Sequence, residues 1–301
     1  MKTEQLSIFD FIENSKIVNN NNVKLLSLFS GIGAFETALD RLNIKYELVN
    51  YCEIDKYASK SYSLIHNVSE DKNLWDITTV DTSKLPNDID LITYGFPCQD
   101  ISIAGCKKGF EHNGERTRSG LFFEALRIIE DTKSKIAIAE NVKNLTSKKF
   151  KNEFEIVLNS LDEAGYNNYW QVLNAKDYGV PQNRERVFII SIRKDIDNDK
   201  FKFPEPYPLK LNVTDMLENK VAENYYLKGE KVDKLISQLI KTKQVNELPC
   251  CCDSTINEPK VRKISNCITA RYNAGIQNQK QIGLCVVESI NINKGDLNGT
   301  T

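Results

Sequence analysis

The sequence predicts an α/β fold, because short apolar runs that fit buried strands alternate with stretches that have helical apolar spacing. Val23–Phe29 is such a run, and it leads into the glycine turn Ser30–Gly33 and then into the amphipathic stretch Ala34–Leu42. Ile89–Tyr94 and Ile136–Ala139 are typical of strands in a parallel sheet that is covered on both faces. A chain of 301 residues with 41% hydrophobic residues can enclose such a sheet and still form a smaller second domain.

The glycine turn predicts a nucleotide site, because strand, glycine turn and helix open a nucleotide-binding βαβ unit. A dinucleotide fingerprint needs a third glycine where this chain has Glu36, whose carboxylate we expect to repel a pyrophosphate at the helix N-terminus. Tyr46–Cys52 is a second strand, and Glu53 follows it at the distance from Gly33 at which an acidic side chain can bind ribose hydroxyls. The pattern favours an adenosine without a pyrophosphate, with an ordinary glycine turn as the alternative.

Cys98 is a candidate nucleophile. It lies in the loop after Ile89–Tyr94, where Pro97 restricts the backbone and the loop leaves the thiol accessible. The carboxyl ends of parallel strands meet at one edge of a sheet, so Glu140, directly after Ile136–Ala139, is expected to share a cleft with Cys98. The alternative is a small buried cysteine that only fills space.

Arg184 and Arg186 stand at alternate positions just before the apolar strand Val187–Ile190. Side chains at alternate positions of an extended chain project to one side. We therefore expect the two guanidinium groups to form a fork for anionic or carbonyl oxygens.

Taken in order, these segments resemble the DNA (cytosine-5)-methyltransferase family, close to the bacterial restriction–modification enzymes. The resemblance runs from about Val23 to Tyr226 and implies a Rossmann-like, S-adenosylmethionine-dependent methyltransferase sheet with a smaller target-recognition domain. The motifs that carry it are Phe29–Gly33, Glu53, Trp75–Thr78, Gly95–Gln99, Ser119–Glu124, Glu140–Val142, Asn174–Gly179 and Gln182–Arg186.

The resemblance also implies the domain organisation. Residues 1–22 would be a flexible N-terminal arm, 23–205 the catalytic domain and 206–301 a target-recognition region. The family's closing helix and glycine–asparagine motif are not found in the polar end of the chain. We therefore expect the recognition region to be truncated at its C-terminus: either a second polypeptide supplies the missing motifs, or the chain is a truncated gene product.

The activity that the resemblance implies is transfer of a methyl group from S-adenosylmethionine to carbon 5 of cytosine in a specific double-stranded DNA sequence. Cys98 would add to carbon 6 of a base flipped out of the duplex, and Glu140 would bind N3 of that base. Arg186 would contact the pyrimidine O2, and Arg184 would order the active-site loop. The cofactor site would comprise Phe29, Gly31, Gly33, Glu53, Ile54, Asp76, Ile77, Pro97 and Leu121.

DNA contacts are expected mainly from the stretch Ser102–Arg118, whose glycines allow movement and whose cations can bind phosphates. A solvated basic loop is the alternative. In the recognition region Arg271 suits a base edge, although a plain β-turn explains it equally well. The expected DNA-binding residues are Gln99, Ser102, Lys107, Arg116, Arg118 and Arg271.

Composition limits the remaining possibilities. A net charge of −1 argues against indiscriminate coating of nucleic acid. No long apolar run and no secretory signal is present, and the 8 cysteines show no pairing framework, so we expect a cytoplasmic protein without a membrane segment. The contiguous Cys250–Cys252 lacks zinc spacing and the chain has only 2 histidines, so no metal site is expected.

Gln5–Phe9 resembles the short peptide by which bacterial replication and repair proteins dock on the sliding clamp. In such a peptide a glutamine binds the rim of a pocket and apolar side chains fill it. An arm that covers the domain's own apolar surface is the alternative.

At the level of the whole chain, three other functions stay open: a tRNA cytosine methyltransferase, an inactive regulator and a recognition subunit that only binds DNA.

Overall fold

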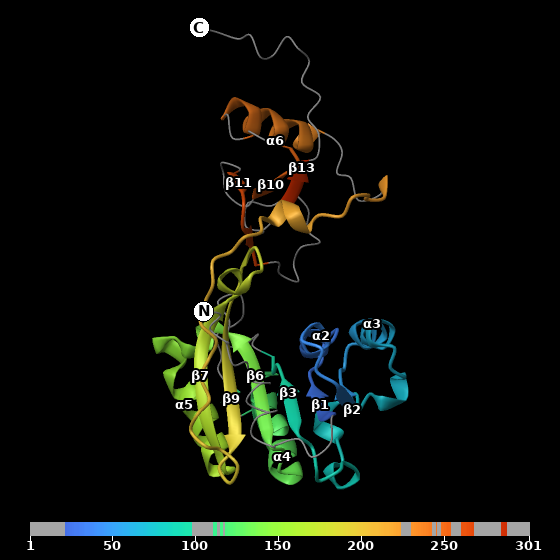
Figure 1. The fold of residues 1–301 in the computed structure, drawn as a ribbon, viewed down its shortest axis with the longest axis vertical. Coiled ribbons are helices and arrows are strands. Elements are labelled where there is room, and N and C mark those ends of the chain that lie inside the picture. The colour runs from blue at the N-terminus through green and yellow to red at the C-terminus, as the bar shows by residue number, and fades with distance from the viewer. Residues whose placement is uncertain are drawn as a thin grey trace. The chain divides into compact units, whose positions relative to one another are not determined.

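The computed structural model describes residues 22–97, 111–112, 115–116, 118–223, 230–242, 245, 248–253, 260–267 and 284–287. These residues form two compact units (Figure 1). The first unit contains the described residues up to Leu173 together with Glu185–Glu205. The second contains Asn174–Arg184 and the described residues from Pro206 onward, so the segment 174–184, which the sequence groups with the catalytic domain, clusters with the second unit.

The first unit is built on a six-stranded sheet with the order β2-β1-β3-β6-β9-β7, which Figure 1 shows side by side. Strand β1 pairs in parallel with both β2 and β3, β3 pairs in parallel with β6, and β9 runs antiparallel to β6. The predicted α/β fold class is confirmed. The strands are β1 (Val23–Leu28), β2 (Tyr46–Cys52), β3 (Leu91–Tyr94), β6 (Ile136–Val142), β7 (Tyr166–Asn174) and β9 (Glu185–Arg193).

Helices cover both faces of this sheet. Leu26 of β1 belongs to a buried cluster with Phe122 and Val157, whereas its neighbour Leu25 belongs to a second cluster with Leu39 and Tyr62. Successive side chains of a strand point to opposite faces, so the two clusters are the two faces of the sheet. The helices are α2 (Ala34–Arg41) and α3 (Lys56–His66) on one face and α4 (Phe122–Thr132) and α5 (Lys151–Glu163) on the other.

Two strand ends differ from the expectation. Strand β6 continues through Glu140 to Val142, and β9 already begins at Glu185, so Glu140 and Arg186 lie within strands and not in loops. The physical reason is the antiparallel β6–β9 ladder, which continues past the last β3–β6 pair, Tyr94 with Ala139.

The second unit has a small core of its own. The amphipathic helix α6 (Glu230–Lys241) contributes Leu235 and Leu239 to a cluster that also contains Cys250 and Cys252. All three cysteines of the triplet are buried residues of strand β10. The strands β10 (Cys250–Asp253), β11 (Lys260–Arg262) and β13 (Leu284–Val287) form an antiparallel sheet, and β8 (Gln182–Asn183) pairs in parallel with β12 (Ser265–Asn266).

The described residues also form several short elements. A two-stranded ladder consists of β4 (Glu111–His112) and β5 (Glu115–Arg116). The 3₁₀ turns are η1 (Glu70–Lys72), η2 (Ile77–Thr79), η3 (Thr82–Lys84), η4 (Arg118–Leu121), η5 (Lys143–Thr146), η6 (Lys148–Phe150), η7 (Ala175–Tyr178) and η8 (Val213–Met216). Within the described part of the chain no helix has the length and apolarity to cross a bilayer, and no cluster of side chains there is suited to a metal ion.

The turn between β1 and α2 requires glycine at position 33. Gly33 has φ +84°, and a Cβ atom built on it would lie 2.0 Å from Nε2 of the His66 side chain. We predict that Gly33→Ala lowers the free energy of unfolding by about 1–2 kcal/mol through the left-handed backbone and by about 1–3 kcal/mol more through overpacking. Urea denaturation measures this loss. Gly165→Ala is the matched control, because Gly165 has φ +93° and open space around an added Cβ; equal losses for the two variants would contradict the prediction.

Candidate active site

An ion pair between Glu140 and Arg186 lies near the carboxyl end of β6. Arg186 Nε is 2.9 Å from Glu140 Oε1, and both side chains are largely buried. In the β6–β9 ladder Glu140 is opposite Phe188, so Arg186, two residues away on the same strand, is its diagonal neighbour on the same face. The antiparallel register therefore brings the carboxylate and the guanidinium group together.

The segment that leads to Cys98 leaves β3 beside this pair. A Cβ atom on Gly95 would lie 3.8 Å from Glu140 Oε2, so this carboxylate oxygen lies beside the backbone at Gly95. The buried Asn141 donates a hydrogen bond from Nδ2 to the carbonyl oxygen of Phe96, at 3.2 Å. Strand β6 thus holds the chain at Phe96, two residues before Cys98. Cys98 itself lies outside the described residues.

Arg184 and Arg186 each have a partner within the unit to which they belong, and the predicted fork of the two guanidinium groups stays a prediction. Arg186 pairs with Glu140 in the first unit. Arg184 donates from Nη1 to Sγ of Cys267 at 3.4 Å, and its N–H donates to Oδ1 of Asn174 at 3.1 Å, both within the second unit. The chain passes from one unit to the other between these arginines, and the alternation of side chains could not reveal that boundary.

A second polar site lies at the carboxyl ends of β1 and β2. The Glu53 carboxylate accepts hydrogen bonds from the N–H groups of Gly31 and Asp55, each at 2.8 Å. Gly31 has φ +56°, and a Cβ atom there would meet no heavy atom within 4 Å. The hydroxyl of Ser30 is buried and has no hydrogen-bond partner among the described residues. The glycine turn therefore offers a free polar group and an open face beside an anchored carboxylate.

Two exposed apolar residues have their backbones close to that of Glu53. The Ile54 side chain is 70% exposed and that of Trp75 is 44% exposed. Trp75, at φ +59°, donates its N–H to Asn73, which also binds the backbone of Glu53. Trp75 is not among the cofactor residues expected from the sequence, although an aromatic residue within the motif Trp75–Thr78 is a signal for it. Ile77, which was assigned to it, is buried in the core.

Glu36 does not face the ligand side of the turn. It is 0% exposed, and Oε1 accepts a hydrogen bond from the Tyr62 hydroxyl at 2.9 Å. Burial and the nearby Glu36 carboxylate raise the pKa of Tyr62, so this phenol stays protonated and donates. The expected repulsion of a pyrophosphate by Glu36 is therefore wrong, because the carboxylate points into the packing between α2 and α3.

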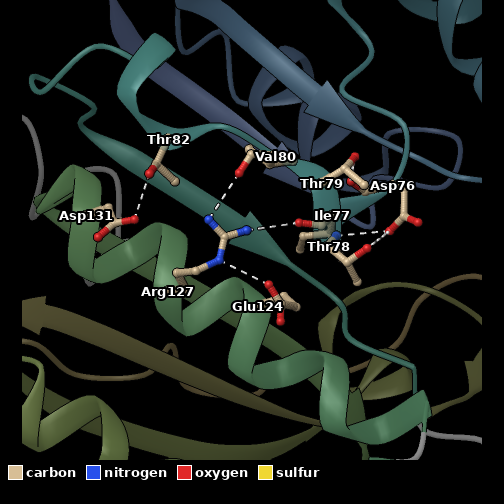
Figure 2. Close-up of polar contacts among 9 residues, drawn as sticks. All are labelled: Asp76, Ile77, Thr78, Thr79, Val80, Thr82, Glu124, Arg127 and Asp131. Atoms are coloured by element: carbon tan, nitrogen blue, oxygen red, sulfur yellow. Dashed lines mark hydrogen bonds and ion pairs between the residues drawn. The ribbon is translucent and has the colours of Figure 1, made fainter.

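Asp76 begins the η2 turn and accepts hydrogen bonds from both the N–H and the hydroxyl of Thr78 (Figure 2). The other end of the turn is held from α4. Arg127 donates to the carbonyl oxygens of Ile77 and Val80, at 3.2 and 3.1 Å, and pairs with Glu124 on its own helix. Figure 2 shows its guanidinium group reaching from α4 to this turn. The Ile77 carbonyl oxygen already accepts the N–H of Val80 at 3.4 Å, so Arg127 gives it a second donor and also binds the Val80 carbonyl oxygen.

The remaining expected residues fall into two groups. Phe29, at φ +52°, and Leu121 pack against the core next to the sheet edge, and Pro97 is half-buried. Outside the described residues lie Cys98, Gln99, Ser102, Lys107 and Arg271, and also the side chains of Arg116 and Arg118, whose backbones belong to β5 and η4.

Three of the described cysteines are structural. Burial raises the pKa of Cys52 to about 12 and that of Cys251 to about 11, and it also raises the pKa of Cys250. Such thiols stay protonated near neutral pH and are poor nucleophiles.

A model of the C-5 cytosine-specific DNA methylase family matches residues 23–294 of the chain. The chain belongs to this family. The orphan methyltransferase M.Rho11sI of Bacillus phage rho11s is 39% identical over 252 residues, which are 74% of this chain and 49% of that protein. The type II methyltransferase M.HhaI of Haemophilus parahaemolyticus is 41% identical over 195 residues, which are 65% of this chain and 57% of that protein. This member of the family thus spans about half the length of those relatives.

Solved structures show the same fold. A mutant of DNMT2 from Spodoptera frugiperda superposes with a TM-score of 0.61 at 19% identity, covering 86% of this chain and 73% of that one. A putative DNA modification methyltransferase encoded within an E. coli prophage gives a TM-score of 0.51 at 21% identity, covering 74% and 69% of the two chains.

The contacts of Arg127 predict its effect on stability. Arg127→Met keeps the aliphatic stem but leaves two carbonyl oxygens without their charged donor, so we expect the free energy of unfolding to fall by about 1–3 kcal/mol. Urea denaturation of the variant measures the change. Arg41→Met, at the exposed end of α2, should change it by less than about 0.5 kcal/mol. Equal losses for the two variants would show that Arg127 does not anchor the turn.

Proposed function

We propose that this chain transfers a methyl group from S-adenosylmethionine to carbon 5 of cytosine in a specific sequence of double-stranded DNA. The observation that carries the proposal is the Glu140–Arg186 pair beside Gly95, three residues before Cys98, in a member of the C-5 cytosine-specific DNA methylase family. Close relatives are named as orphan and type II methyltransferases, which is consistent with a restriction–modification setting.

The chemistry needs a nucleophile, because carbon 5 of cytosine is unreactive while the ring is aromatic. The Cys98 thiolate forms a bond to carbon 6, and the electron pair of the 5,6 double bond moves toward carbon 5. Negative charge develops on N3 and O2 during this addition. After carbon 5 takes the methyl group, with S-adenosylhomocysteine as the leaving group, transfer of the carbon-5 proton to solvent and elimination of the Cys98 thiolate would restore the aromatic ring.

Glu140 and Arg186 are suited to the charge that develops on the ring. Arg186 binds Oε1 of Glu140, and Oε2 lies beside Gly95, on the side from which the Cys98 loop begins. The Glu140 carboxylate then binds N3 of the base once N3 carries a proton, and Arg186 keeps this carboxylate in one orientation. Groups that are ordered before the reaction stabilise developing charge without reorganisation during it.

The residues near Glu53 fit the nucleoside part of S-adenosylmethionine. Glu53 has acceptor capacity beyond its two backbone donors, the face above Gly31 is open, and Ile54 and Trp75 provide apolar surface for a purine. When bound, this cofactor supplies a methyl group that is electrophilic because it is attached to a sulfonium.

Access to carbon 6 requires that the cytosine leave the duplex, at a cost of a few kcal/mol that contacts with the protein repay. The cations expected to bind phosphates in the segment 102–118 lie outside the residues whose side chains are described. Among the described residues, Lys148, Lys149 and Lys151 are exposed on the segment that follows β6. We propose that these lysines contribute to binding the DNA backbone.

Covalent capture tests the reaction. DNA containing 5-fluorocytosine in the target sequence should become irreversibly attached to the purified protein in the presence of S-adenosylmethionine, because fluorine cannot leave carbon 5 as a proton does. Denaturing electrophoresis detects the adduct. Cys98→Ser should abolish attachment and retain duplex binding.

The matched control is Cys52→Ser, because Cys52 is buried and its thiol is not expected to react. This variant should still be captured. Capture that persists in Cys98→Ser would contradict the assignment of the nucleophile. Transfer of a tritiated methyl group to tRNA, with none to DNA, would replace the DNA substrate by the RNA alternative.

The N-terminal arm carries a further partner hypothesis. Gln5–Phe9 lies outside the described residues, so its docking on a sliding clamp stays a prediction, as does the second polypeptide. A peptide of residues 1–18 should bind a bacterial sliding clamp with micromolar affinity, about −8 kcal/mol, in fluorescence anisotropy. Replacing Leu6 and Phe9 by Ala should remove binding, and failure of the unmodified peptide to bind would leave the arm without this role.

A further inference from the structure

Asn73 is a buried side chain next to the proposed cofactor site. It follows the η1 turn, forms a bridge with Tyr51 of β2, and is 6% exposed. The N–H of Leu74 donates to the carbonyl oxygen of Tyr51 at 2.7 Å, which extends the contact with the strand. Asn73 therefore lies along the carboxyl end of β2, where the chain turns into Glu53.

Both ends of the Asn73 carboxamide are hydrogen-bonded. Oδ1 accepts the N–H of Glu53 at 3.0 Å and the N–H of Trp75 at 2.8 Å. Nδ2 donates to the carbonyl oxygen of Glu53 at 2.9 Å and to Oγ of Ser59 at 2.9 Å. One side chain thus binds the backbone of Glu53 on both sides and the backbone of Trp75 as well.

The orientation of this amide is determined by its partners. Two N–H donors converge on Oδ1, and a carbonyl oxygen, which can only accept, faces Nδ2, so the reversed amide would lose these bonds. Ser59 is fully buried and also shares a hydrogen bond with the Tyr51 hydroxyl, at 3.1 Å. The amide is therefore held in place by Ser59 of α3, which is itself hydrogen-bonded to Tyr51 of β2.

The effect on Glu53 is pre-organisation. The Glu53 carboxylate uses part of its acceptor capacity for Gly31 and Asp55, and the remaining lone pairs are available to ligand hydroxyls. A carboxylate whose backbone is fixed loses less conformational entropy when a ligand binds. The same amide fixes Trp75, so the polar and the apolar parts of the site share one support.

We propose that Asn73 is a positioning residue of the cofactor site, which acts through Glu53 and Trp75 without touching the ligand. The inference rests on the proposed function, because it takes Glu53 as the acceptor for the ribose hydroxyls of S-adenosylmethionine. No other side-chain type supplies the same set of bonds: aspartate lacks the donor, serine is too short, and glutamine would displace the amide by one methylene.

A double-mutant cycle tests the proposal in the 301-residue chain. Calorimetry measures the Kd of S-adenosylmethionine for the unmodified protein, Glu53→Gln, Asn73→Ala and the double variant. Each single change should raise Kd about tenfold or more, the effect of leaving buried polar groups unpaired. The double variant should be little worse than Glu53→Gln, because residues that act through one another are not additive.

A second readout separates positioning from general loss of structure. The unmodified protein should prefer S-adenosylmethionine over its analogue without ribose hydroxyls, and the ratio of the two Kd values should fall toward one in Asn73→Ala. Asn73→Asp keeps the Oδ1 acceptor and removes the Nδ2 donor. The same ratio of Kd values is measured with this variant if Asn73→Ala does not fold. Asn168→Ala is the matched control, because Asn168 is a hydrogen-bonded amide on β7, away from Glu53 in the sheet order; it should leave the ratio unchanged.

The outcomes are distinguishable. If Glu53→Gln leaves both Kd values unchanged, the proposed cofactor site is wrong. If Glu53→Gln weakens binding but the effect of Asn73→Ala adds to it in full, or the ratio of Kd values does not change in either Asn73 variant, the positioning role is wrong and the proposed function stands.

Discussion

The site depends on the parallel register of four strands. Strand β1 pairs with β2 and with β3 so that Leu28 is opposite both Cys52 and Tyr94, and Tyr94 is in turn opposite Ala139. Three of these strands therefore end at one edge, level with Ala139 of β6, which itself continues to Val142. Because both faces of the sheet are buried, a slip of one residue would exchange the side chains of the two faces. The burial that stabilises the fold also fixes the position of its reactive groups.

Beyond that edge the backbone is held by side chains. Asn73 binds the backbone of Glu53, Asn141 binds the carbonyl oxygen of Phe96, and Arg127 binds the η2 turn. In each case the chain has just left a strand or a short turn, where regular backbone pairing ends. Buried backbone groups need partners, and amide or guanidinium groups provide them here. These residues come from neighbouring elements, so the geometry of each loop depends on the packing of the whole unit.

The sequence was informative wherever one local pattern determines one local structure. The apolar runs located the strands, and Glu53 directly follows β2 as expected, whereas Glu140 lies inside β6 near its end. It failed where a side chain has a choice of partners. Glu36 looked like a group facing the ligand but is buried against Tyr62. The alternation of Arg184 and Arg186 did not indicate that the chain passes between the two units at this point.

What the sequence by itself determined is the order of elements, the family and the chemical types at the strand ends, because these follow from apolar periodicity, glycine turns and ordered motifs. Only the tertiary structure decided that Arg186 binds Glu140, that Trp75 is exposed beside Glu53, and that Asn73 supports both Trp75 and Glu53. The physical reason is that these contacts join segments far apart in the chain or turns with unusual backbone angles. The register of the sheet and the need to satisfy buried polar groups select the partners of these side chains. No local sequence pattern specifies either of them.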